Sequence, residues 1–250
     1  MIMRKLIGIL FLLSFLPVVA QENVVGEYMY IYHRDKSVER IDISDIDSIT
    51  FTVPQIVYEA VDLGLSVKWA ACNVGALSPW ESGGYYAWGE TEEKEIYDWN
   101  TYKYCNGTQS YITKYCTNSS YGNVDGKTAL EPEDDVAHVE RGGSWRMPTT
   151  GEMSELMNKC TWTWTKLNGV SGYRITGPSG NSIFIPITGY RYGTAYNGSD
   201  VIGYFWSRDL IMGNEARTAY HMNYVSEGFN WSASLARSAG LPVRPVCEAE

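Results

Sequence analysis

The chain offers few of the residue patterns that hydrolytic or redox chemistry requires. Its three histidines, His33, His138 and His221, are far apart and form no His-x-x-x-His pair, so a zinc-protease motif is absent. Residues 142–146 (Gly-Gly-Ser-Trp-Arg) resemble a nucleophile elbow only in part, because the last position is Arg where glycine is required. Residues 177–182 are glycine-rich but lack the lysine of a phosphate loop, and they predict a hairpin turn. The sequence therefore predicts no catalytic residues.

Acidic residues between positions 123 and 135 are the strongest candidates for metal ligands. Hard cations such as calcium take several oxygen ligands from one loop. The EF-hand register fails, because placing Gly126 sixth puts Tyr121 first and Pro132 twelfth. We therefore expect no cofactor, with these acids in solvent or at a helix cap, and keep a calcium site of another geometry as the alternative. Its candidate ligands are Asp125, Glu131, Asp134 and Asp135.

Aromatic residues make up 14% of the chain, with nine Trp and nineteen Tyr, which is more than one core of this size needs. Their rings are rigid, amphipathic contact surfaces that suit sugar or protein recognition. The alternative is that they pack short strands and loops into the core, which we expect of Trp206. Several rings gather around glycine-rich turns in the segment 162–206. The predicted ligand-binding residues are Tyr190, Tyr192, Tyr196, Trp162, Trp164 and Trp231.

The first twenty residues have the order of a cleavable secretory signal. Basic Arg4 and Lys5 precede an apolar run at 6–15 and a small-residue site that ends at Ala20. The apolar run is shorter than the roughly 20 residues of a membrane-spanning helix. We therefore expect residues 1–20 to be removed, no membrane insertion afterwards, and a secreted protein in the periplasm or at the cell surface.

The net charge argues against two classes of partner. The whole chain has 20 basic and 29 acidic residues, and removal of Arg4 and Lys5 with the signal leaves a net charge of about −11 with neutral histidines. Nucleic acid and anionic membranes are unfavourable partners for so acidic a protein. The expected partner is a glycan or a protein ligand.

Strands dominate the predicted secondary structure. Alternating apolar and polar residues from 27 to 53 predict a β-hairpin followed by a third short strand, so residues 21–56 are expected to form a small N-terminal β module. Residues 57–250 are expected to form one main domain. Its short strands are predicted on both sides of Gly64 and at 84–89, 173–176, 182–187, 203–207, 219–223 and 241–246.

Two helices complete a predicted α+β class with one long and one short helix. Thr149 and Glu152 form the pattern of a capping box, which places the start of the long helix. A shorter helix is predicted from Pro132 to about Val139, because proline and acidic residues favour a first helical turn. The apolar stripe of the long helix consists of Met153, Leu156, Met157 and Cys160.

Five cysteines are present in a chain expected to fold outside the cytoplasm, where disulfides persist. An odd number leaves at least one without a bridge, and sequence alone selects no pairing. Residues 97–125 form a long irregular segment rich in Tyr, Asn, Ser, Thr and Gly. Loops of this length are commonly functional, disordered or stapled. A Cys105–Cys116 bridge would close a short loop within this segment.

The run Trp145-Arg146-Met147-Pro148-Thr149, followed by the predicted helix and Cys160-Thr-Trp-Thr-Trp164, resembles the Fibrobacter-type major paralogous domain. This family is abundant in secreted proteins of gut Bacteroidetes. The resemblance covers about residues 57–247. Further motifs that fit it in order are Val61-Asp-Leu-Gly-Leu-Ser-Val-Lys-Trp69, Gly84-Tyr-Tyr-Ala-Trp-Gly-Glu90, Glu133-Asp134-Asp135, Gly177-Pro-Ser-Gly-Asn-Ser182, Gly189-Tyr190-Arg191, Tyr204-Phe-Trp206-Ser207 and Val243-Arg244-Pro-Val-Cys247.

This resemblance implies a C-type lectin-like fold, which the family shares with formylglycine-generating enzymes. In that fold a disulfide often ties a helix to the last strand, which here implies a Cys160–Cys247 bridge. The resemblance also implies structural roles for Arg146, Pro148 and Thr149. The enzyme branch needs a reactive cysteine pair and a copper site near the end of the chain, where this sequence offers only Cys247. Its activity is therefore not expected here.

Three functional hypotheses follow. The first is a secreted, non-catalytic binding module that presents aromatic rings to a glycan or protein ligand. The second is a structural or adhesive component of the cell surface, in which the strands at 27–53 pair with the sheet edge of a partner. The third is a hydrolase whose carboxylates no motif assigns.

Overall fold

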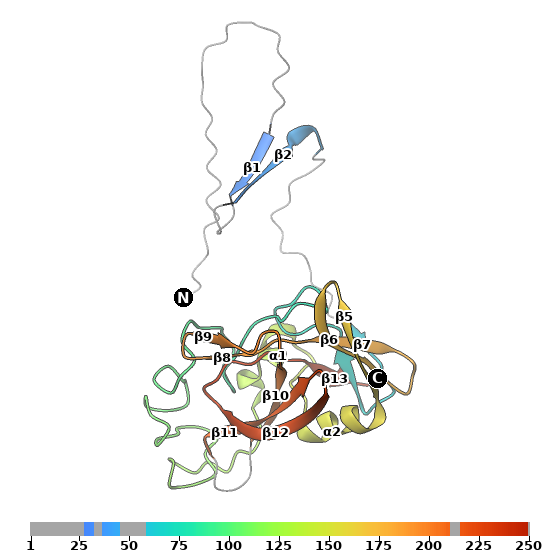
Figure 1. The fold of residues 1–250 in the computed structure, drawn as a ribbon. Coiled ribbons are helices and arrows are strands. Elements are labelled where there is room, and N and C mark those ends of the chain that lie inside the picture. The colour runs from blue at the N-terminus through green and yellow to red at the C-terminus, as the bar shows by residue number, and fades with distance from the viewer. Residues whose placement is uncertain (1–27, 33–36, 46–58, 211–215, 250) are drawn as a thin grey trace, which may run out of the picture. The chain divides into compact units, whose positions relative to one another are not determined.

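The computed structural model describes residues 28–32, 37–45, 59–210 and 216–249 (Figure 1). The predicted signal segment 1–20 and the predicted third strand near residues 49–53 lie outside these ranges. By its contacts the chain divides into two compact units, residues 1–55 and 56–250. In the described part of the chain, no helix is long and apolar enough to cross a membrane.

The described part of the first unit is the predicted β-hairpin. Strand β1 (Tyr28–Tyr32) pairs antiparallel with β2 (Val38–Asp42), and a short 3-10 turn, η1 (Ile43–Asp45), follows. Tyr30 lies opposite Arg40 in the register of the two strands. A two-stranded hairpin of this size buries little apolar surface by itself. Large side chains therefore stay exposed on it, including Tyr30 and Val38, each 51% exposed.

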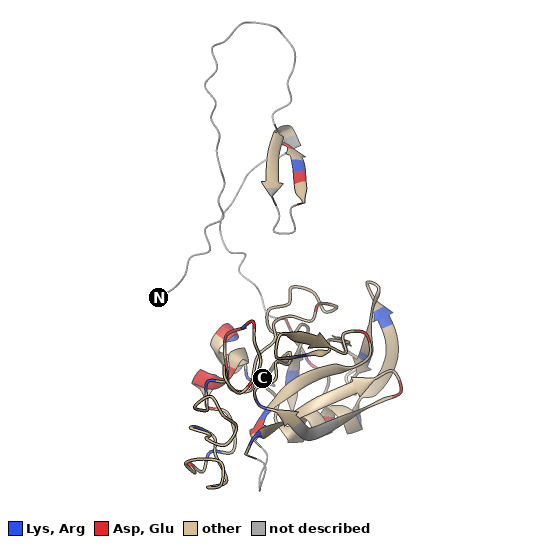
Figure 2. Ribbon diagram, turned by 60° about the vertical axis from the view of Figure 1, so that its left-hand side comes forward, with Lys and Arg blue, Asp and Glu red and all other residues tan. Residues whose placement is uncertain are grey.

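The described part of the second unit is strand-rich with two helices, which confirms the α+β class. Few charged residues lie on its strands, so most of its charge is in loops and helices (Figure 2). Its described sheets are antiparallel throughout. They are β3 (Ala60–Val61) with β4 (Val67–Ala70) and β13 (Val246–Glu248); β5 (Thr161–Leu167) with β6 (Val170–Thr176) and β7 (Ser182–Pro186); β8 (Tyr190–Tyr192) with β9 (Ala195–Asn197); and β10 (Gly203–Leu210) with β11 (Thr218–Val225) and β12 (Gly228–Ala236).

Both predicted helices form, and one of them begins later than expected. Helix α2 (Thr150–Lys159) has the complete capping box of Thr149 and Glu152, and it packs beside the β10–β11–β12 sheet (Figure 1). The predicted helix at 132–139 is interrupted. Residues Pro132–Asp134 form a 3-10 turn, η2, and the extended backbone of Asp135 then caps helix α1 (Val136–Arg141). The side chain of Asp135 accepts hydrogen bonds from the amides of Ala137 and His138 in the first turn of α1. The helix therefore begins after Asp135, and the acidic residues 133–135 do not form one continuous helix with it.

Two strand predictions need correction, and several observed strands were not predicted. Residues 84–89 form only a single bridge, between Tyr86 and Leu241, because Gly83 and Gly89 turn the backbone at both ends with φ of 71° and 83°. The predicted strand at 241–246 begins only at Val246. In the segment 162–206, the strands predicted at 173–176, 182–187 and 203–207 correspond to β6, β7 and β10, whereas β5, β8 and β9 were not predicted. The alternation of Thr and Trp in β5 is the period-two signal for its strand.

Tyrosine side chains hold the irregular part of the unit. Residues 71–131 form no named helix or strand, all of them within the described ranges, and aromatic residues pack this segment onto the core. Tyr97 donates to the carbonyl oxygen of Tyr85 at 2.6 Å, and Tyr102 donates to that of Trp88 at 2.8 Å. Trp88 and Trp206 are fully buried, as expected for Trp206. Much of the high aromatic content is therefore used inside the molecule.

The predicted disulfides do not form among the five cysteines, all of which lie in described residues. The thiol of Cys105 donates to the carbonyl oxygen of Trp99 at 2.9 Å, and that of Cys116 donates to Asn118 at 3.2 Å. The two thiols donate to different carbonyl oxygens, and the Cys105–Cys116 bridge is absent. The Cys160–Cys247 bridge is also absent, with Cys160 at the end of α2 and Cys247 paired with Lys68 between β13 and β4.

Candidate ligand-binding site

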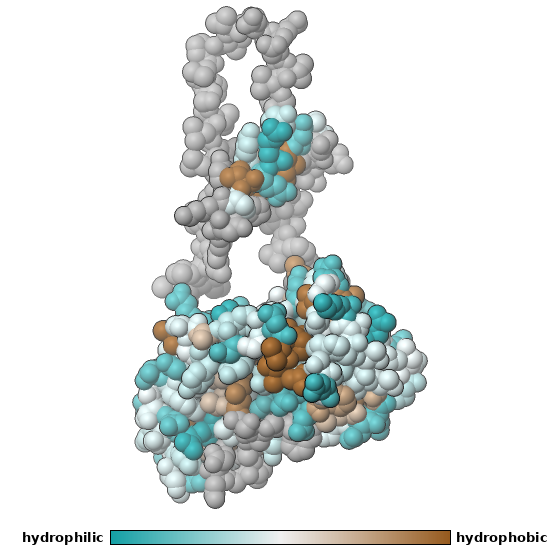
Figure 3. All heavy atoms as spheres, in the orientation of Figure 1, coloured by the Kyte–Doolittle hydropathy of each residue, from teal (hydrophilic) through white to brown (hydrophobic). Residues whose placement is uncertain are grey.

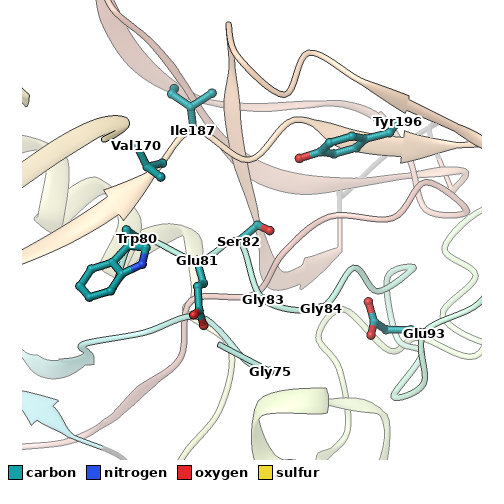
Figure 4. A pocket seen from close by; sticks show the side chains of 10 residues that line it. All are labelled: Gly75, Trp80, Glu81, Ser82, Gly83, Gly84, Glu93, Val170, Ile187 and Tyr196. Carbon is teal, nitrogen blue, oxygen red and sulfur yellow. The ribbon is translucent and has the colours of Figure 1, made fainter. Parts of the chain in front are cut away.

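One pocket of the second unit lies between the loop after β4, the strands β6 and β9, and the residue that follows β7. It has a volume of about 540 Å³. Trp80, Val170 and Ile187 gather at one end, and Tyr196 and Glu93 lie at the other (Figure 4). The rest of its lining comes from Gly75, Glu81, Ser82, Gly83 and Gly84. On the face shown in Figure 3, the surface is mainly hydrophilic with a small hydrophobic area near its centre.

Backbone amides position both carboxylates of this pocket. Glu81 accepts from the amides of Leu77 at 2.8 Å and Ser78 at 3.2 Å, both through Oε2. Glu93 accepts from the amide of Tyr85 at 2.8 Å through Oε1. Each carboxylate therefore keeps a second oxygen for a hydrogen-bond donor of a ligand. Two fixed acceptors and two aromatic rings line one cavity.

The ring of Tyr196 is held by a buried neighbour. The hydroxyls of Tyr85 and Tyr196 lie 2.8 Å apart, and both reach the carbonyl oxygen of Thr188. The two rings meet edge to face with centroids 5.5 Å apart. Burial, and then the bond to Tyr196, raise the pKa of Tyr85, so its phenol stays protonated at neutral pH. The exposed edge of Tyr196 thus has a rigid support.

Glycine is required where the pocket floor approaches the backbone of Val74. Gly83 has a φ of 71°, in the left-handed region that favours glycine. A Cβ at this position would overlap the carbonyl oxygen of Val74. The neighbouring Gly84 has no room either, since a Cβ there would overlap the ring of Tyr86. A side chain at either position would therefore force neighbouring atoms to move.

A second pocket of about 350 Å³ adjoins the first and shares Glu93 with it. Its other lining residues come from the loop at 85–97 and from β8. They are Tyr85, Lys94, Glu95, Tyr97 and Arg191. The two pockets together offer rings, carboxylates and a guanidinium group along a continuous stretch of surface.

The structure separates the six ring residues that the sequence singled out. Among those whose side chains the structure describes, Tyr196 is the one that lines either of these two pockets, and Tyr192 stands 51% exposed outside both. Tyr190 packs on the ring of Tyr204. Trp162 stacks on Phe229 with centroids 4.0 Å apart, Trp164 packs against Tyr173, and the side chain of Trp231 in β12 lies outside the described part of the chain.

Sequence reasoning missed Trp80, Glu81, Glu93 and Arg191, which come from loops and from a strand of three residues. The only local signal was Trp-Glu followed by paired glycines at 80–84, a composition typical of a tight surface turn.

The acidic candidates for calcium fall into three places. Ligand atoms of Glu131 and Asp134 lie within 4.8 Å of one another, together with Glu133. The ammonium of Lys114 lies among them, 2.6 Å from Glu131 and 2.5 Å from Asp134. Burial works to raise the pKa of Asp134, but hydrogen bonds from Lys114 and from two tyrosines lower it to about 2. The chain thus supplies its own cation to this cluster.

The other two candidate acids, Asp125 and Asp135, accept hydrogen bonds from backbone amides. Asp125 accepts the amides of Tyr115 at 2.6 Å and Cys116 at 3.2 Å. Asp135 caps α1 and also accepts the amide of Met147, with its nearer oxygen at 2.8 Å. Neither residue lies in the cluster of Glu131 and Asp134. The expected role at a helix cap is therefore confirmed for Asp135.

Comparison with known proteins adds no relative: no family model matches the chain, and neither a curated protein nor a solved structure matches it. The function is therefore argued from the pockets themselves.

Proposed function

We propose that this protein is a secreted, non-catalytic module that binds a glycan in the pocket between Trp80 and Tyr196. Its action outside the cytoplasm follows from the signal-like first twenty residues. The C-type lectin-like fold that the motif resemblance implies belongs to the same proposal. A protein ligand is the alternative occupant of the pocket.

The pairing of rings with fixed carboxylates carries this proposal. A sugar has an apolar face that packs on an aromatic ring and hydroxyls that donate to carboxylate oxygens. Trp80 and Tyr196 offer such rings, and Glu81 and Glu93 each keep one oxygen without a backbone donor among the described residues. Because their other oxygens are already held by amides, little side-chain entropy is lost when a ligand binds.

Truncation of Trp80 to alanine is expected to weaken glycan binding at least tenfold, and Glu93→Gln to weaken it severalfold. The first change removes the ring surface and the second removes the charge of an acceptor. The measurement is a glycan-array screen of residues 21–250, followed by titration calorimetry with the best ligand. The addition of a chelator is expected to change nothing, since Lys103, Lys114 and Lys127 already form ion pairs with the acidic cluster.

Tyr192→Ala is the matched control, because this ring is exposed but lies outside both pockets. The proposed pocket is wrong if Tyr192→Ala abolishes binding while Trp80→Ala leaves it intact. That result would place the ligand on the outer surface of the β8–β9 hairpin. If no glycan binds the wild-type protein, a protein ligand becomes the leading alternative.

A second candidate function, adhesion or assembly at the cell surface, is favoured by the exposed side chains of the first unit. Hydrophobic atoms are visible on the β1–β2 hairpin in Figure 3. Tyr30, Ile31 and Val38 are exposed on it by 51%, 37% and 51%. Both strands have an unpaired edge within the described residues, and such edges can add to the sheet of a partner.

Deletion of residues 21–55 with the signal kept is expected to release the protein from the surface of producing cells into the medium. The reason is that the hairpin is the proposed attachment element. The measurement is quantitative immunoblotting of surface and medium fractions, with the double change Tyr30→Asp and Val38→Lys as a variant that keeps the chain length. Unchanged distribution of both variants would contradict an adhesive role for the hairpin.

A further inference from the structure

Arg191 is the cation of the second pocket that the described residues leave without a polar partner. Its side chain forms no hydrogen bond or ion pair with any described residue, although it is only partly exposed and lines the pocket. The pocket's other cation differs. The ammonium of Lys94 lies 2.8 Å from Glu90 and donates to the carbonyl oxygen of Thr101 at 3.1 Å.

The backbone and two aromatic rings fix the position of this guanidinium. The amide of Arg191 donates to the carbonyl oxygen of Gly240 at 2.8 Å, and the amide of Gly240 donates back at 3.0 Å. Arg191 is paired with Tyr196 across the β8–β9 hairpin. Its Cζ lies 4.7 Å from the ring centroid of Tyr196 and 5.4 Å from that of Tyr85. Stacking of this kind holds the planar group while its N–H donors remain available.

Such a guanidinium is suited to one kind of ligand group. The planar fork of arginine matches a carboxylate with two parallel N–H···O bonds, and these charge-assisted bonds are the strong ones. The oxygen of a neutral sugar hydroxyl would not match both parallel N–H donors of this guanidinium. Because Arg191 stacks on the ring of Tyr196, its ligand group lies next to the first pocket.

The neighbouring charges restrict how an anion can be held here. Glu93 and Glu95 line the same pocket, and the mature chain is acidic overall. General attraction of polyanions is therefore unfavourable. A single carboxylate in direct contact with Arg191 gains a short-range pair, and its surrounding hydroxyls can donate to Glu93. This combination is the chemistry of an acidic sugar.

We propose that Arg191 binds the carboxylate of an acidic sugar in the second pocket, next to a sugar held between Trp80 and Tyr196. This inference rests on the proposed glycan-binding function. The ligand is thus an oligosaccharide of at least two sugars that carries a carboxylate, bound across the two pockets that share Glu93.

The test is titration calorimetry of residues 21–250 with matched pairs of ligands. The probes are oligogalacturonates against their methyl esters, and sialyllactose against lactose. For at least one pair, the acid is expected to bind at least tenfold more tightly than its neutral partner. Arg191→Gln is expected to abolish this preference, because it lowers the affinity for the acid at least tenfold more than the affinity for the neutral partner. Arg191→Lys is expected to keep part of the preference, because it keeps the charge but loses the fork.

The possible outcomes distinguish failure of the role of Arg191 from failure of the proposed glycan-binding function. Equal binding of acid and neutral partners, with binding still lost in Trp80→Ala, would overturn the role of Arg191 and leave the glycan pocket standing. A preference for the acid that survives in Arg191→Gln would also overturn it. If the wild-type protein binds neither these probes nor any glycan of the array, both proposals fail. Thermal melts of Arg191→Gln that match the wild type exclude loss of folding as the cause.

Discussion

Replacement of Arg237 by methionine is expected to lower the free energy of unfolding by about 3–5 kcal/mol, because it leaves several buried acceptors without a donor. Arg237 is fully buried, and its guanidinium lies 4.8 Å from the ring centroid of Trp88. The acceptors that it serves are Tyr102 Oη at 3.0 Å and the carbonyl oxygens of Tyr115 at 2.9 Å, Ala216 at 3.0 Å and Lys114 at 3.0 Å.

Urea denaturation followed by tryptophan fluorescence measures this loss. Arg174→Met is the matched control, since Arg174 is exposed on β6, and its change is expected to stay within about 0.5 kcal/mol. Arg237→Lys is expected to fall between the two, because an ammonium cannot reach acceptors that surround a planar fork. A cost below about 1 kcal/mol for Arg237→Met would show that the irregular segment holds together without this arginine.

Acidification from pH 6.5 to 4 is expected to cost about 3 kcal/mol of stability through His221 alone. His221 is buried between β10 and β12, with its ring near those of Tyr204 and Trp206. Burial lowers its pKa from 6.5 to about 4, and only a backbone hydrogen bond to Ala219 acts in the opposite direction. The unfolded chain therefore binds this proton at a higher pH than the folded chain does. Stability from the neutral ring is fully present above pH 6.5 and is lost as the pH falls to about 4.

The measurement is the free energy of unfolding across this pH range for the wild type and for His221→Phe. The phenylalanine variant is expected to lose this part of the pH dependence, while His138→Gln, on the partly exposed helix α1, is expected to keep it. A slope between pH 4 and 6.5 that is identical in His221→Phe and the wild type would contradict the assignment to His221.

The elements that could be predicted from the sequence are those with a local cause. The capping box at Thr149 and Glu152 depends on residues three apart, so α2 was placed at its observed start. The turn at 177–182 was recognised because glycine and proline disrupt two alternating runs. The break at Asp135 was missed, because whether an acid continues or caps a helix depends on a distant donor, here the amide of Met147.

The candidate site was largely beyond sequence reasoning for a related reason. Trp80 and Glu93 come from a loop without regular structure, and Arg191 and Tyr196 come from a hairpin about a hundred residues later. These four residues share no helical or strand periodicity in the sequence. Ring composition alone did not distinguish Tyr196 at the pocket from Trp162, which stacks on Phe229, since both lie in the same aromatic-rich stretch. Burial separates the two roles, and burial depends on the whole fold.

The first and last strands of the second unit, β3 and β13, lie on either side of β4, where Val61 and Val246 are both paired with Trp69. Neighbouring strands are about 4.8 Å apart, so Val61 and Val246 lie within roughly 10 Å of each other. The chain between these two valines therefore begins and ends in the same sheet. First and last strands that lie this close together are typical of domains that tolerate insertion into a longer polypeptide.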